Sequence, residues 1–103
     1  MTQLNQDNPL PSWLAVTPEG VTVTLAYKAH FNGVAVDKLT MRAPSVRDVE
    51  AARIAHPDDY EKMEKNLFCS LLTATEAELV SLKYKDYKRL QVGYFRLVEE
   101  DGV

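Results

Sequence analysis

The side chains best suited to covalent chemistry are one cysteine and two histidines, spread over 103 residues. Cys69 together with His30 or His56 would supply a nucleophile and a general base. Cys69 lies, however, between Phe68 and Leu71 in a periodic apolar segment, where a cysteine behaves as a small hydrophobic residue. We therefore expect no catalytic site and no enzymatic activity.

Metal and cofactor sites are also not expected. The stretch from His56 to Asp59 offers one imidazole and two carboxylates, but no second histidine or cysteine follows at ligand spacing. The two acids suit the first turn of a helix instead. The four glycines are isolated, so the chain has no glycine-rich phosphate loop.

Lysines and tyrosines are interleaved between Lys83 and Arg89. Aromatic rings beside cations are typical of single-strand binding. Tyr87 shares a helical face with Leu90, however, which directs it towards the core. The net charge of −3 includes no clustered basic face of the kind that duplexes require. Nucleic acid is therefore not the expected partner, and a small nucleic-acid-binding regulator stays as an alternative.

Length and composition predict one globular domain. The chain is 46% hydrophobic and 26% charged, and two separate cores in 103 residues would each be too small. The lone cysteine and the polar first residues favour a reducing cytoplasm without a signal peptide. No apolar run approaches the ~20 residues of a membrane-spanning helix, so we expect no membrane partner.

Residues 1–19 are predicted to be an irregular N-terminal arm, and residues 20–103 a single α+β domain. The arm contains three prolines and several amides, which disfavour regular structure. Trp13 and Leu14 form an apolar pair within it. The pair would either dock on the core of its own domain, which we prefer, or anchor a partner.

Two strands are predicted next. Residues 21–27 alternate in polarity, which is typical of a half-buried strand. Asn32 and Gly33 favour a tight turn into an antiparallel strand over residues 34–42. The apolar parity of that strand changes near Asp37, which indicates a bulge. The residues expected on the core face of the first strand are Val21, Val23, Leu25 and Tyr27.

Helices follow the hairpin. Apolar residues at three- and four-residue steps predict helices over about 45–56, 57–72, 75–82 and 86–99, with Ser45 as the cap of the first. Thr75 and Glu78 have the spacing of a capping box. The predicted fold class is therefore α+β, with an N-terminal β-hairpin followed by a small bundle of three to four helices. An unpaired hairpin edge offers a route to a homo-oligomer.

A partner-binding surface needs apolar side chains left over from the core. The last helix is expected to bury one stripe, whose members are Tyr87, Leu90, Tyr94, Leu97 and Val98. Val92 lies off that stripe and Phe95 lies at its margin. The candidate partner-binding residues are Val92, Phe95, Trp13 and Leu14.

Three stretches of the chain resemble the tail assembly chaperones of Mu-like contractile-tailed phages and prophages. They are L-T-M-R-A-P-S-V-R-D-V at 39–49, L-L-T followed by T-x-x-E-L at 71–79, and D-Y-K-R-L-Q at 86–91. The resemblance implies a chaperone in the bacterial host that binds the phage tape measure protein before the tail tube polymerises. It also implies that the protein is absent from the mature virion. A structural tail component retained in the virion is the other alternative.

Overall fold

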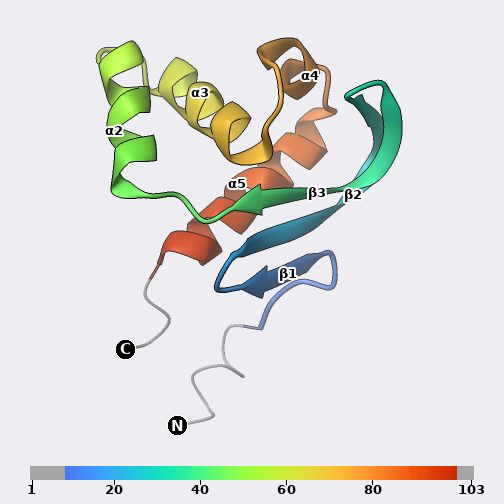
Figure 1. The fold of residues 1–103 in the computed structure, drawn as a ribbon. Helices are drawn as coiled ribbons and strands as arrows, with labels where there is room; N and C mark the ends of the chain where they lie inside the picture. Colours follow the sequence, from blue (N-terminus) through green and yellow to red (C-terminus); the bar gives the residue numbers. More distant parts are fainter. Residues whose placement is uncertain (1–8, 100–103) are drawn as a thin grey trace, which may run out of the picture.

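The computed structural model describes residues 9–99, which form an α+β fold. In this part of the chain a three-stranded antiparallel sheet of order β1-β2-β3 is followed by four helices (Figure 1). α5 returns across the sheet and contacts β1 and β2, while α3 packs against β3 and α2. The elements are β1 (Leu14–Thr17), β2 (Gly20–Phe31), β3 (Val34–Arg42), α2 (Val46–Ala55), α3 (Tyr60–Leu72), α4 (Glu76–Val80) and α5 (Tyr84–Val98).

The first strand corrects the expectation of an irregular arm. β1 pairs with β2 from Leu14 opposite Val23 to Thr17 opposite Gly20. The backbone N–H of Thr24 also donates to the Trp13 carbonyl at 2.8 Å. The prolines of this segment flank the strand and do not interrupt it, so they remove no ladder hydrogen bond. The predicted hairpin is therefore two strands of a three-stranded sheet; residues 1–8 of the predicted arm lie outside the described residues.

A register shift interrupts the β2–β3 ladder close to the predicted bulge. Thr24 pairs with Lys38 and Ala29 pairs with Val36, so four β2 residues lie opposite Asp37 alone. The extra residues therefore belong to β2. Tyr27 lies within this unpaired segment and is 51% exposed, whereas Leu25 before it and Ala29 after it are buried. The prediction that Tyr27 lies on the core face is wrong for this reason.

The side chains of α5 satisfy the backbone of the shifted segment. Asp86 is fully buried, and its carboxylate accepts the N–H groups of Ala26 at 2.7 Å and Tyr27 at 3.0 Å. One turn later, Nη1 of Arg89 donates to the carbonyl of Thr24 at 2.8 Å. Buried backbone groups need such partners when a ladder is interrupted. α5 is therefore fixed to β2 by charged hydrogen bonds as well as by apolar packing.

Two of the predicted helix starts, those of α2 and α4, are confirmed by their caps. Ser45 and Asp48 form a capping box at α2, and Thr75 and Glu78 form another at α4. α3 begins at Tyr60, three residues after the predicted start at Pro57, because Asp59 is its N-cap. The predicted helix over 75–82 is shorter than expected, since α4 ends at Val80. α5 begins two residues before the predicted start. No helix in the described residues is long and apolar enough to span a bilayer.

Candidate partner-binding site

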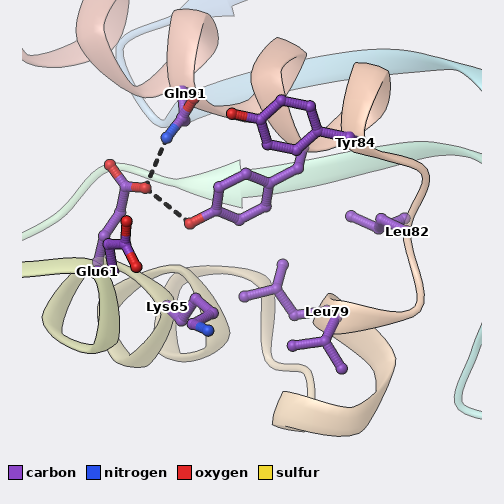
Figure 2. Close-up of a pocket in the computed structure, with 9 residues that line it drawn as sticks. Glu61, Lys65, Leu79, Leu82, Tyr84 and Gln91 are labelled. Carbon is purple, nitrogen blue, oxygen red and sulfur yellow. Dashed lines mark hydrogen bonds between the residues drawn. The ribbon is translucent and has the colours of Figure 1, made fainter.

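A groove with a volume of about 340 Å³ lies between α3, α4 and α5 (Figure 2). We call it the α3–α5 groove. Three helices and the loop before α5 supply its walls, so it exists only in the folded chain. It is lined by Glu61, Glu64, Lys65, Leu79, Val80, Leu82, Tyr84, Tyr87 and Gln91.

The α4 end of the groove is apolar. Leu79 is buried in the core and Leu82 is half-buried beside it, whereas Val80 is 56% exposed and Tyr84 is 72% exposed. Glu78 fixes α4 at this position, since its carboxylate closes the capping box and also accepts the N–H of Asn32 at 2.7 Å. The turn between β2 and β3 is thereby tied to the helix that forms one end of the groove.

The α3 wall carries a carboxylate held by α5. Oε1 of Glu64 accepts the hydroxyl of Tyr87 at 2.7 Å and the amide Nε2 of Gln91 at 2.8 Å (Figure 2). Burial, with a smaller contribution from this bond, raises the pKa of Tyr87 well above its usual range. The phenol therefore keeps its proton and remains a donor. Two neutral donors, about one turn apart on α5, fix the orientation of Glu64.

Aromatic rings separate α3 from α5. The ring of Phe68 lies 5.8 Å from that of Tyr87 and 5.4 Å from that of Tyr94, in tilted arrangements. Such pairs are favourable at these separations. Because bulky rings fill the space between the helices, the two backbones do not pack closely, and the surface above the rings stays open as the groove.

Phe95 and Val92, both predicted as partner contacts, are on the surface of α5. Phe95 is 63% exposed and Val92 is 40% exposed. Val98, which was expected on the buried stripe, is 45% exposed. That expectation is wrong because consecutive helical residues differ by about 100°, so Val98 cannot share the direction of the inward-facing Leu97.

The exposed aromatic surface continues along α5 beyond the groove. Seen down the helix axis, its residues fall within an arc of about 100° that faces away from the sheet. We call this surface the α5 strip. Three of its side chains are exposed and the others are half-buried. The members are Tyr84, Tyr87, Gln91, Tyr94, Phe95 and Val98.

The predicted pair Trp13 and Leu14 lies elsewhere. Leu14 is only 6% exposed and belongs to the hydrophobic core, so it offers no surface to a partner. Trp13 is half-buried, with the guanidinium of Arg89 5.0 Å from its ring centre. Arg89 lies about 120° from Phe95 around the helix. The structure therefore does not bring Trp13 into the α5 strip.

The interleaved basic stretch does not form one surface. Arg89 contacts β2 and Trp13, and Tyr87 contacts Glu64. Lys88 lies with its ammonium 5.6 Å from the centre of the Tyr84 ring. Tyr84 and the lysines are exposed, but Tyr87, the second ring on which a nucleic-acid base could stack, is directed towards Glu64.

Cys69 is half-buried and lines, together with His56, a second pocket of about 390 Å³. Burial, with the nearby charges of Glu76 and Glu78, raises the pKa of the Cys69 thiol. A catalytic cysteine requires the opposite shift. Among residues 9–99 no cluster of three or more histidine, cysteine or acidic side chains is placed to hold a metal ion.

The stretches that carry the family resemblance determine the fold. Within D-Y-K-R-L-Q, Asp86 holds β2, Leu90 is buried in the core, and Tyr87 and Gln91 hold Glu64. Within L-T-M-R-A-P-S-V-R-D-V, the guanidinium of Arg42 binds both oxygens of the α2 capping acid, at 2.7 and 3.0 Å.

The comparison with protein families supports the resemblance that these stretches carry. Residues 22–99 match the family described as phage tail assembly chaperone proteins, E, or 41 or 14. The match covers most of the chain and includes all three stretches. No curated protein and no solved structure shows significant similarity to the chain. The chain therefore belongs to the phage tail assembly chaperone family.

Proposed function

We propose that this chain binds the phage tape measure protein before the tail tube polymerises around it. Family membership supports a role in tail assembly. The partner is inferred from the notable surface of the fold: a groove that opens onto a strip of exposed aromatic side chains. In this proposal the chain acts by binding alone, in the cytoplasm of the bacterial host, and is absent from the mature virion.

The α3–α5 groove and the α5 strip support this proposal. Tyr84 is 72% exposed and Phe95 is 63% exposed on the same side of one helix. Large aromatic side chains are the commonest anchors of protein interfaces. An apolar floor with one fixed carboxylate is the kind of surface on which an amphipathic helix docks, with its apolar face in the groove.

Co-expression with the tape measure protein encoded nearby tests the proposal. Affinity capture followed by size-exclusion chromatography with light scattering should yield a soluble complex. A double variant, Tyr84→Glu with Phe95→Glu, should abolish it, because a carboxylate buried against an apolar partner is strongly unfavourable. The matched control is Ile54→Glu, since Ile54 is 80% exposed on α2 and outside the groove.

Each outcome of this experiment is informative. Loss of the complex in the double variant, with an unchanged circular dichroism spectrum and an intact complex for Ile54→Glu, supports both partner and surface. If the complex survives the double variant, the tape measure protein remains the partner but this surface is not its binding site. If both proteins are soluble and no complex forms, the proposed function is wrong. Detection of the chain in purified particles would instead favour the structural tail component.

A further inference from the structure

The chemistry of the bound segment can be inferred from Glu64. We propose that the α3–α5 groove receives an amphipathic helix of about four turns, which presents a lysine or arginine to Oε2 of Glu64. This inference rests on the proposed function, because it describes the segment of the tape measure protein that is bound. It names a binding residue and a charge requirement that the exposed apolar surface alone does not specify.

Only one of the two carboxylate oxygens of Glu64 accepts hydrogen bonds within the described residues. Both of its hydrogen bonds end on Oε1, from the neutral donors of Tyr87 and Gln91. Within residues 9–99, Oε2 accepts no hydrogen bond and Glu64 forms no ion pair. A half-buried carboxylate without a cation has an incompletely compensated charge. A guanidinium or ammonium reaching Oε2 would form a charge-assisted hydrogen bond there.

The side chains around Glu64 favour a cation over an anion. Glu61, nearly one turn earlier on α3, lines the same groove, and Lys65 is the only cation among its lining residues. Neither Glu61 nor Lys65 forms an ion pair within the described residues. Both carboxylates line the groove from α3, and that of Glu64 is held by α5. A basic side chain on the occupant would therefore reduce the net negative charge of this wall.

The α5 strip sets the length and the orientation of the occupant. From Tyr84 to Val98 the strip is about 21 Å long, which corresponds to a partner helix of about 14 residues. Lys88 lies beside Tyr84 on the margin of the strip that faces away from α3. The occupant's basic residue therefore lies towards α3, and its apolar face covers the exposed rings of Tyr84 and Phe95.

Peptide binding tests this inference. The probes are fluorescently labelled, overlapping peptides of about 30 residues that span the tape measure protein, measured by anisotropy. Glu64→Gln preserves the side-chain shape and an oxygen that accepts from Tyr87 and Gln91, and it removes the charge. It should weaken the best peptide by about tenfold or more, the range expected for a lost charge-assisted bond. Glu50→Gln on α2, which removes the same charge outside the groove, should leave the dissociation constant unchanged.

A double-mutant cycle identifies the paired residue. Each lysine or arginine of the best peptide is changed to glutamine in turn. Replacement of the residue that pairs with Glu64 should weaken binding to the wild-type chain about tenfold and leave binding to Glu64→Gln almost unchanged. Equal binding of the wild type and Glu64→Gln, both folded by circular dichroism, overturns the inference. A homodimer that forms through the groove and is lost in Glu64→Gln also overturns it, because a second copy would then be the occupant.

Failure of the inference is distinguishable from failure of the proposed function. If neither the peptides nor the intact tape measure protein bind the wild-type chain, the proposed function is wrong. If only the intact protein binds, Glu64→Gln and Glu50→Gln are compared by affinity capture, and equal recovery overturns the role of Glu64. If Glu64→Gln binds as tightly as the wild type, a positive charge on the occupant is not required, and the proposed function is unaffected.

Discussion

Replacement of Asp86 by asparagine should strongly destabilise the fold. Asp86 is fully buried and accepts two backbone N–H groups, from Ala26 at 2.7 Å and Tyr27 at 3.0 Å. Asparagine keeps one oxygen and places an NH₂ group where the second oxygen was. One backbone donor of β2 would then face another donor without an acceptor.

The magnitude follows from the bonds that are lost. A hydrogen bond to a charged group contributes about 1.5–3 kcal/mol, and a buried donor left without a partner costs about 1–3 kcal/mol. We therefore expect Asp86→Asn to lower the free energy of unfolding by about 2–4 kcal/mol. That is a large part of the roughly 5–15 kcal/mol available to a domain.

Urea denaturation followed by circular dichroism measures this change. The control is Asp37→Asn, which removes an exposed carboxylate opposite the same register shift and should change the unfolding free energy by no more than about 0.5 kcal/mol. A loss for Asp86→Asn no larger than that of the control would refute the assignment of Asp86 as the partner of the β2 backbone.

Three further predictions concern stability. Gly93→Ala should cost about 1 kcal/mol in thermal unfolding, because a Cβ there would lie 3.2 Å from methyl groups of Leu14 and Val23, and overpacking outweighs the gain in helix propensity; greater stability would contradict this. Tyr87→Phe should cost about 1 kcal/mol through the lost bond to Glu64, and an unchanged urea midpoint would contradict it. The guanidinium of Arg42 holds the pKa of Asp48 well below its usual range. A carboxylate whose pKa is lower in the folded than in the unfolded protein stabilises the fold at pH values above the unfolded pKa, and this stabilisation is lost as the pH falls. The difference in unfolding free energy between wild type and Asp48→Asn, measured in urea titrations, should therefore be constant near neutral pH and should narrow below about pH 4. A difference that widens in acid would contradict this.

Local chemistry explains why much of the fold could be predicted from the sequence. The cap at Ser45, the capping box of Thr75 and Glu78, the turn at Asn32 and Gly33 and the position of the register shift each depend on residues close together in the chain. Capping residues and turn residues act over three or four positions. These features were therefore predictable, and the structure confirms them.

Non-local pairing explains what was missed in the sheet. β1 is stabilised by pairing with β2, by burial of Leu14 and by the contact between Trp13 and Arg89. The docking of Trp13 and Leu14 on the core was the preferred prediction, but the pairing with β2 and the contact with Arg89 are not visible in a proline-rich segment taken alone. The exposed position of Tyr27 likewise depends on the interruption of the β2–β3 ladder between Thr24 and Ala29, which the alternation of polarity in β2 does not reveal.

The candidate site was predicted only where a single helix determines it. The exposure of Phe95 and Val92 follows from the periodicity of α5, and the same periodicity places Tyr84 on the side of Phe95. The groove needs Glu64 from α3 and Val80 from α4 in addition, and their placement depends on tertiary packing. The role of these residues in binding stays a prediction.

Site-specific photo-crosslinking tests the central claim most directly. A benzoylphenylalanine is introduced at Tyr84 or, as a control, at Ile54, and each chain is co-expressed with the tape measure protein and irradiated. Both positions are exposed, at 72% and 80%, but only Tyr84 lines the groove. We predict a crosslink to the tape measure protein from position 84 and none from position 54. A crosslink from position 54 alone, or from neither position in a captured complex, would contradict the assignment of the groove as the binding site.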